Sequence, residues 1–238
     1  MQRIFKLYLK REGIGKIGTY LAIILLSATL ITLIIVQGLA KDEKLGEILP
    51  MIFQGSPKVQ GIVNFYIFEI LFIRAGVMLL QGFLALQIIA STFVNRQIVQ
   101  LAAAPMTRAK IYYGMIAVIG FITGIILMFT HGVGLLLICW YLHVFKFNGF
   151  ILLLIKDWFL DILFISASLF SCAIAMIIKK AGYIISTSIG LIIILCNMAV
   201  ASYSSESNYL LFIVLVITTI ISCLGNLLAQ QYFNKQDI

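Results

Sequence analysis

Charged side chains are scarce in this sequence of 238 residues: only 11% are Asp, Glu, Lys or Arg, whereas 62% are hydrophobic. A soluble domain of this length has roughly 25% charged residues and less than half apolar ones. Too little polar surface is therefore present to cover a water-exposed globule, and a mean hydropathy of +1.11 agrees with this. The composition excludes a soluble globular domain and predicts an integral membrane protein.

Motifs for nucleotide hydrolysis, metal-dependent proteolysis and thiol redox chemistry are also missing. The nearest approach to a nucleotide-binding loop, Gly15-Lys16, has Lys10 in place of the first glycine and Ile17 in place of Ser or Thr. His131 and His143 are twelve residues apart, so they do not form a metal-ligand pair on one helical turn, and packing or interfacial roles are predicted for both. The sequence predicts no metal site, no cofactor bound by this chain and no catalytic residues.

No closely spaced cysteine pair is present, because the four cysteines lie singly inside apolar runs, at Cys139, Cys172, Cys196 and Cys223. Buried free thiols behave as small hydrophobic side chains, and that role is predicted for them.

What the sequence does contain is a series of apolar runs of roughly 20 residues or more, which is the length that spans a bilayer as a helix. A membrane barrel would instead alternate over segments of roughly ten residues. In lipid every backbone polar group must be bonded internally, so these runs should be helical. We predict an all-α polytopic membrane protein with a single transmembrane domain over residues 1–238 and six transmembrane helices, at about 18–39, 61–94, 111–142, 150–178, 183–201 and 209–232.

Basic residues at the N-terminus alternate with apolar ones. On a helix over residues 1–16, Arg3, Lys6 and Lys10 fall on one side, away from Ile4 and Phe5. This pattern predicts an amphipathic helix in the headgroup layer, and the alternative is a frayed, merely positive tail.

Positive charge indicates how the chain is oriented. Six spans place both termini on one side, and eleven of the 17 Lys and Arg residues lie on that side. Basic residues concentrate on the cytoplasmic face of membrane proteins, so both termini and the loop over residues 95–110 are predicted to be cytoplasmic. The net charge of +8 is explained in this way, without a nucleic-acid partner.

Several ionisable residues interrupt the apolar runs, where charge is costly and is usually paired or functional. Glu69 and Arg74 lie in the second predicted helix, and Asp157 and Asp161 share one face of the fourth. With a rise of about 1.5 Å per residue, Arg74 and Asp161 reach similar depths. We predict that Arg74 pairs with Asp161, and that Glu69 pairs with Lys156; the alternative is that these side chains snorkel to the outer interface.

Small residues inside two helices suggest packing contacts. Gly120 and Gly124 form a small-xxx-small pair that allows another helix to approach closely, and packing within the chain is favoured over a dimer seam. On the fourth predicted helix, Ser166, Ser168 and Ser171 either line a polar path or, as is commoner, bond back to the helix backbone.

One polar interruption is longer than a helix connection requires: residues 95–115, NRQIVQLAAAPMTRAKIYYGM. Residues 97–104 favour two helical turns, which Pro105 ends because it lacks a backbone donor. Leu101 offers an apolar anchor. Arg96, Arg108 and Lys110 offer positive charge to an acidic partner surface, the alternative being attraction to anionic lipid.

The stretch Leu101-Ala-Ala-Ala-Pro105-Met106-Thr107-Arg108, with Ile111 and Gly114 after it, resembles the type-2 permease family of ABC transporters. That family shows a leucine-rich short helix, then a small residue, Pro, an apolar residue, Ser or Thr, and a basic residue. Six spans behind an N-terminal interfacial helix also resemble it. The chain departs from the pattern over residues 94–97, where an acidic residue and a glycine are common, and at Met115, where lysine is common.

The resemblance implies that two permeases, identical or paired with a sister chain, associate with two separate ATPase subunits that bind ATP and Mg²⁺. The cytoplasmic loop then acts as a coupling helix seated on the ATPase. The residues implied in that contact are Arg96, Gln100, Leu101, Ala104, Pro105, Thr107, Arg108 and Lys110. The expected location is the cell membrane, as in bacterial plasma membranes.

Short external loops favour an exporter, because they leave little room for a large receptor domain. The expected substrate is an amphipathic or hydrophobic peptide, as in export of or immunity to antimicrobial peptides, or a lipophilic compound, as in multidrug efflux. The rival interpretation is an ATPase-independent channel or scaffold. An intramembrane enzyme is disfavoured because Asp157 and Asp161 lack a catalytic partner.

Overall fold

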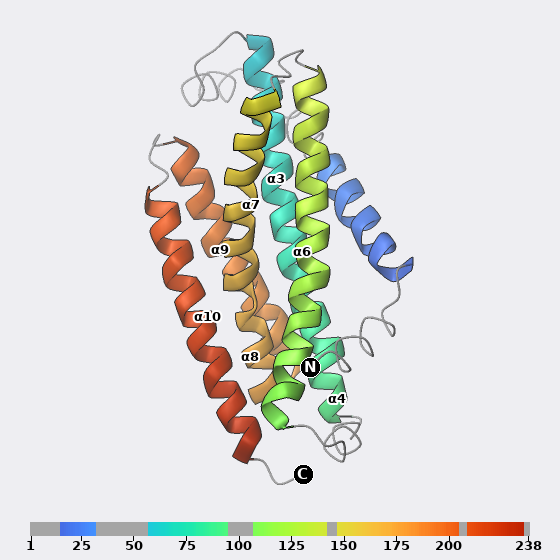
Figure 1. Ribbon diagram of the computed structural model, residues 1–238, viewed down its shortest axis with the longest axis vertical. Helices are drawn as coiled ribbons and strands as arrows, with labels where there is room; N and C mark the ends of the chain where they lie inside the picture. Colours follow the sequence, from blue (N-terminus) through green and yellow to red (C-terminus); the bar gives the residue numbers. More distant parts are fainter. Residues whose placement is uncertain (1–14, 32–56, 95–106, 142–146, 205–208, 236–238) are drawn as a thin grey trace.

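The computed structural model describes residues 15–31, 57–94, 107–141, 147–204 and 209–235, and the regular structure in these ranges is helical (Figure 1). Five of the helices are long and apolar enough to cross a membrane, and a sixth apolar helix, Gly15–Ile31, is shorter. The predicted helical class is confirmed. The sixth span and the side on which the termini lie stay predictions. An interfacial helix was predicted over residues 1–16, and residues 1–14 of it lie outside the described residues.

Successive long helices run in opposite directions through the bundle (Figure 1). Their bounds are α3 (Pro57–Leu84), η1 (Ala85–Ala90), α4 (Ser91–Val94), α6 (Arg108–Tyr141), α7 (Phe147–Ser168), α8 (Phe170–Ile177), α9 (Ala181–Ser204) and α10 (Tyr209–Lys235). The chain passes from α3 through the π-helical η1 into α4 without leaving the helix. The fourth predicted helix is divided at Leu169 into α7 and α8.

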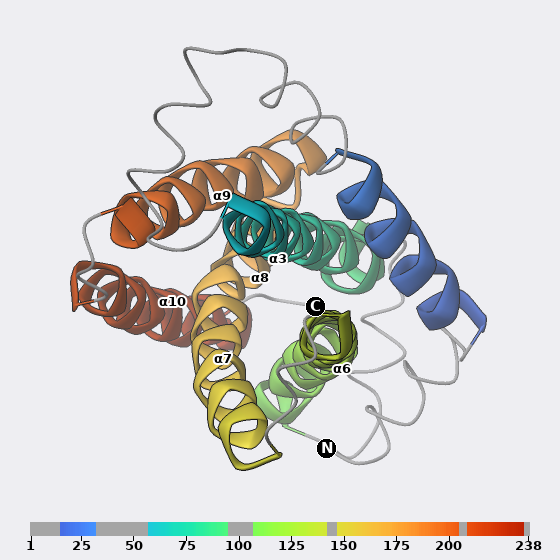
Figure 2. The same ribbon diagram turned by 90° about the horizontal axis from the view of Figure 1, so that it is seen from above.

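Helix α3 lies at the centre of the bundle when it is viewed from above (Figure 2). It packs against α6, α7 and α9, while α10 packs against α7, α8 and α9. The Gly15–Ile31 helix lies against α3 from outside, where the Ile24 side chain comes within 3.2 Å of the place that a Cβ on Gly76 would occupy. The central position of α3 means that any polar group on it can reach several other helices.

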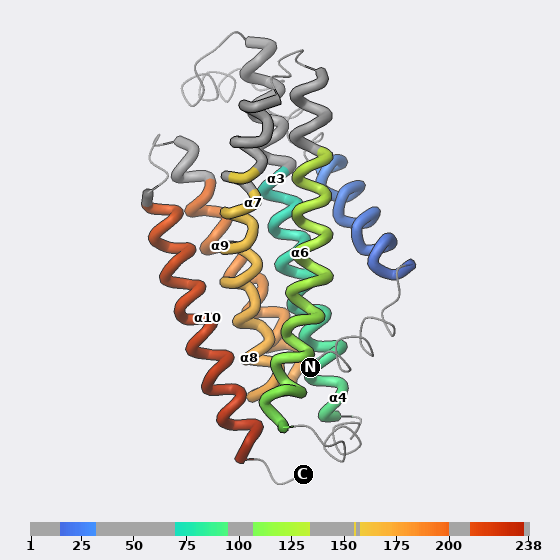
Figure 3. The backbone as a smooth tube through the Cα atoms, in the orientation of Figure 1, coloured from blue at the N-terminus to red at the C-terminus, as the bar shows by residue number. Residues whose placement is uncertain are grey.

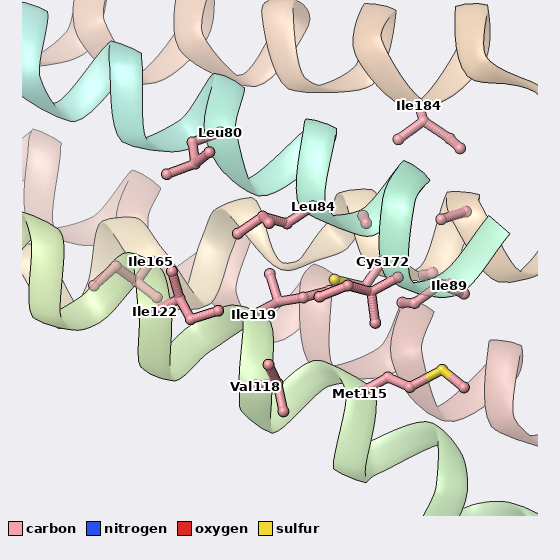
Figure 4. Packing of buried hydrophobic residues seen from close by; sticks show 14 of the residues in the cluster. Leu80, Leu84, Ile89, Met115, Val118, Ile119, Ile122, Ile165, Cys172 and Ile184 are labelled. Carbon is pink, nitrogen blue, oxygen red and sulfur yellow. The ribbon is translucent and has the colours of Figure 1, made fainter. Parts of the chain in front are cut away.

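A tightly packed apolar cluster joins η1 to α6 and α8 (Figure 4). It includes Leu84 at the end of α3, Ile89 of η1, Met115 and Ile119 of α6, and Cys172 of α8, all at most 1% exposed. Lipid tails are as apolar as these side chains, so close packing rather than exclusion from water holds the cluster together in a membrane.

Polarity is distributed inside out compared with a soluble protein. Arg74 and Asp161 are 1% and 0% exposed, whereas Leu228 on α10 is 61% exposed. The outer faces of α9 and α10 are therefore apolar and exposed, and no described part of the chain packs on them. This distribution, with ionisable groups facing the bundle interior, is what a bilayer imposes on helices that cross it.

Candidate functional site

Three ionisable side chains from three helices meet inside the bundle. Arg74 of α3 donates from Nε to Asp161 Oδ1 of α7 at 3.0 Å, and its Nη2 lies 2.9 Å from the same oxygen. His131 Nδ1 of α6 lies 2.6 Å from Asp161 Oδ2. The predicted pairing of Arg74 with Asp161 is confirmed. We call this group, Arg74, His131 and Asp161, the charged level.

His131 was not expected in this group, because its relation to Asp161 is visible only when depths on α6 and α7 are compared. It lies ten residues before the end of α6, and Asp161 lies fourteen residues after the start of the antiparallel α7. The two residues therefore reach neighbouring depths. A comparison of these depths is the signal that could have found the contact. The packing or interfacial role predicted for His131 is corrected to a bond with a buried carboxyl group.

The charged level combines an ion pair with a histidine contact. An arginine stays cationic in proteins, and the Asp161 carboxyl group lies between the Arg74 guanidinium and the His131 ring, whose tautomer sets the direction of the histidine bond. The Arg74 guanidinium also lies 4.7 Å from the centroid of the Phe164 ring. A buried charge is tolerated when it is paired and hydrogen-bonded, which is the situation here.

The other ionisable residues predicted along this path are Glu69 and Asp157. Both lie on described helices, α3 and α7, but their side chains are outside the described residues, as is that of Lys156. The proposed contact of Glu69 with Lys156 thus stays a prediction.

A second polar contact joins the same two helices one heptad further along. Gln81 Nε2 donates to Ile165 O at 3.2 Å, and the Ser168 hydroxyl donates to Gln81 Oε1. Arg74 and Gln81 are seven residues apart, as are Asp161 and Ser168, so α3 and α7 run parallel with matching faces (Figure 1). We call Gln81 and Ser168 the amide level.

The remaining serines of α7 and α8 bond to backbone oxygens three or four residues before them. Ser166 donates to Ile162 O at 2.7 Å, and Ser171 donates to Ser168 O at 2.9 Å. The commoner of the two alternatives, bonding back to the helix backbone, is confirmed for both.

A third contact lies nearer the end where α6 begins. Tyr112 OH donates to Asn226 Oδ1 of α10 at 2.6 Å. The Asn226 amide in turn donates to Leu169 O at 3.2 Å and to Ser222 O at 2.9 Å. We call Tyr112 and Asn226 the phenol level, and the three levels together the polar track.

Two helix irregularities lie beside the polar track. At Leu169 the regular ladder is interrupted, and the Leu169 carbonyl accepts from Cys172 N at 3.0 Å as well as from Asn226. The π-helical η1 packs against α8 just past this break (Figure 3). Irregular backbone at membrane depth persists only where protein groups satisfy it, and side chains of α3 and α10 do so here.

Glycines let the helices of the track approach each other. A Cβ on Gly120 or Gly124 would lie 3.8 Å from Leu169 or Ile165, so this pair packs within the chain, as favoured. Two further contacts are tighter: a Cβ on Gly82 would clash with Ser188, and one on Gly225 would lie 2.6 Å from the Phe170 ring.

The residues predicted to couple to a partner fall into two groups. Thr107 and Lys110 are exposed at the start of α6, and Arg108 donates to backbone oxygens at the end of α10. The others lie outside the described residues: Arg96, Gln100, Leu101, Ala104 and Pro105.

Metal-ligating side chains do not gather in the parts of the chain that the structure describes: no group of three or more His, Cys, Asp or Glu is found there. The described cysteines, Cys172, Cys196 and Cys223, are free thiols. The chemistry that the polar track offers is therefore hydrogen bonding and charge pairing between helices.

No family model matches this chain, and neither a curated protein nor a solved structure matches it. Its function has to follow from its own residues. The helices establish the coarse description, a protein with several helices compatible with a multi-pass membrane location.

Proposed function

We propose that this chain is the membrane-spanning permease subunit of an ATP-driven ABC exporter. In this proposal it forms the translocation path with a second permease, and separate ATPase subunits supply the energy. The substrate is an amphipathic or hydrophobic peptide or a lipophilic compound, exported from the cytoplasm.

The observation that carries the proposal is the position of residues 95–107 between two interior helices. This stretch and the first residue of α6 hold the motif Leu101 to Arg108, and the stretch joins the end of α4 to the start of α6. Helix α4 continues α3, which is the central helix of the bundle. A displacement applied to this stretch would thus act directly on the two helices that contribute Arg74 and His131 to the charged level.

The polar track supports the proposal in a second way. Its levels connect α3 to α7, α6 to α7 and α6 to α10, so the helices on either side of the loop are bonded to the rest of the bundle. A movement of α3 and α6 relative to α7 has to exchange the bonds of the charged level. Such an exchange between two discrete arrangements is how a transporter changes access across the membrane.

Purification of the full-length chain from its native membrane tests the proposal. We expect an ATPase subunit to co-purify, and reconstituted vesicles to accumulate a lipophilic or peptide probe only with ATP and Mg²⁺. Deletion of residues 102–104 should abolish this accumulation, while Leu210→Ala, at the opposite end of the bundle, should leave it unchanged. ATP-independent accumulation, with no ATPase bound and no effect of the deletion, would instead identify a channel or scaffold.

A further inference from the structure

Four side chains from four parts of the fold meet where residues 95–107 leave and rejoin the bundle. The Phe93 ring of α4 meets the Phe233 ring of α10 edge to face, with centroids 5.3 Å apart. The Lys179 ammonium, between α8 and α9, lies 4.6 Å from the Phe93 ring centroid. Arg108 of α6 donates to Phe233 O at 3.4 Å and to Asn234 O at 3.1 Å. We call Phe93, Arg108, Lys179 and Phe233 the loop clamp.

Each contact of the loop clamp satisfies a group that would otherwise be costly there. The last carbonyls of a helix have no partner in the helix itself, and a cation is favoured beside them. Arg108 meets both needs at the end of α10. Phe233 is fully buried. Its ring edge faces Phe93, an arrangement that aromatic pairs favour.

Lys179, which directly follows the C-cap of α8, has an unusual backbone conformation. Its φ of 58° lies in the left-handed region, where a non-glycine residue is disfavoured. Strained residues of this kind persist where their surroundings hold them, and here the ammonium lies over the Phe93 ring. The turn between α8 and α9 is thereby attached to the end of α4.

Beyond the clamp, towards the middle of the bundle, lie the two helix irregularities. The π-helical η1 immediately precedes α4, and the break at Leu169 immediately precedes α8. Helix η1 packs against α8 in the apolar cluster, where Ile89 and Cys172 are labelled (Figure 4). Bends in helices occur at such interruptions rather than within regular turns.

We propose that the loop clamp joins the ends of α4, α6 and α10 and the α8–α9 turn into one body. This body moves as a unit when the chain between Phe93 and Arg108 is displaced, and the bending occurs at η1 and Leu169. Displacement is thus carried to α8, α9 and α10 as well as to the two helices that the loop joins. The source of the displacement rests on the proposed function, but the existence of the body does not.

Spin-label distances in the full-length protein in lipid nanodiscs test whether the body is rigid. Labels at Val94 and Lys235 report on α4 against α10, and labels at Val94 and Lys180 report on α4 against the α8–α9 turn; all three positions are exposed. We expect a single narrow distance distribution for each pair. In the Phe93→Leu/Arg108→Gln background both distributions should lose their narrow peak.

The control is a second aromatic pair of α10. Phe159 of α7 and Phe212 near the start of α10 stack with centroids 6.3 Å apart, at the end of α10 remote from the clamp. The Phe159→Leu/Phe212→Leu background should leave both narrow peaks in place. Unchanged peaks in the clamp variant, or equal broadening in this control, would overturn the proposal.

A milder variant separates the two arms of the clamp and keeps the test usable if the double variant fails to fold. Lys179→Met keeps the length of the side chain but removes its charge, so the peak for Val94 and Lys180 should broaden while that for Val94 and Lys235 stays narrow. Lys179→Arg restores a cation over the ring and should restore the peak. Broadening by Lys179→Arg as large as by Lys179→Met would contradict the role of the cation.

The same labels distinguish this proposal from the proposed function. If an ATPase co-purifies, adding nucleotide should shift the clamp body against a label at the start of α10 while both clamp peaks stay narrow. Without any ATPase, narrow peaks that the clamp variant broadens still support the body, and only the permease assignment fails. If the unmodified protein instead transports normally with an ATPase but gives broad peaks, the permease assignment stands and the proposal of a rigid clamp body fails.

Discussion

The charged level and the phenol level both join helices inside the bundle, but they are built from different chemical groups. Arg74 forms an ion pair with Asp161, and His131 forms a hydrogen bond with the same carboxyl group, at donor–acceptor distances of 2.6 to 3.0 Å. Tyr112 and Asn226 make neutral hydrogen bonds. His131 and Tyr112 are nineteen residues apart on α6, which corresponds to about 28 Å along the helix.

The difference teaches which end of the bundle resists rearrangement. Separating Arg74 from Asp161 leaves two uncompensated charges away from water, whereas separating Tyr112 from Asn226 leaves two unsatisfied dipoles. The first is the far larger penalty. The phenol level should therefore rearrange more readily than the charged level.

Breaking the ion pair should give the largest effect. Arg74→Met or Asp161→Leu alone should lower the free energy of unfolding by about 3–5 kcal/mol, because each leaves a buried charge without its partner. The double variant should recover most of this loss, since neither charge remains. Thermal unfolding in detergent measures the effect, and a double variant no more stable than the worse single variant would contradict the pairing.

Removing the third member of the charged level should give an intermediate effect. His131→Leu deletes one hydrogen bond to a carboxylate and should lower stability by about 1.5–3 kcal/mol. Thr130→Val, the neighbouring residue whose hydroxyl donates to Ile126 O on its own helix, is the matched control and should change little. If both variants lose the same stability, the contact of His131 with Asp161 does not contribute to the free energy of unfolding.

The phenol level should respond less. Tyr112→Phe removes the donor to Asn226 Oδ1 and should lower stability by about 0.6–1.5 kcal/mol. The double variant Tyr112→Phe/Asn226→Leu removes both partners, although it also gives up the Asn226 bond to Leu169 O. A double-mutant cycle measures the coupling, and a loss matching that of Arg74→Met would invalidate the contrast between the two levels.

The smallest effect is expected at Gly120, between the two levels. A methyl group there would lie 3.8 Å from Leu169 Cδ1, which is ordinary contact, so Gly120→Ala should change stability by no more than about 0.5 kcal/mol. Gly225→Ala, beside Asn226, should be costlier because the new methyl meets the Phe170 ring. The two variants, compared in one unfolding assay, test whether the helices are packed more closely at Gly225 than at Gly120.

The sequence predicted those features that a bilayer imposes on any chain. Long apolar runs have to become helices, and a charge such as Arg74 has to find a partner such as Asp161 at similar depth. The histidine was harder to assign, because His131 is informative only in relation to Asp161, thirty residues away on another helix.

The irregular segments were not predictable from local signals. Neither Leu169 nor the η1 sequence ALQIIA carries the proline or glycine that usually marks a helix interruption. The break at Leu169 is stabilised by Asn226, which lies 57 residues further along the chain, so only the tertiary structure reveals it.

The ion pair also bears on how the protein is made. Arg74 and Asp161 are 87 residues apart in the chain. At a synthesis rate of about 5–20 residues per second, Arg74 is synthesised about 4–17 s before Asp161. During that interval α3 lacks the carboxyl group that pairs with its arginine, which makes its insertion into a bilayer more costly. We expect membrane integration of the central helix to be completed only after α7 has been translated.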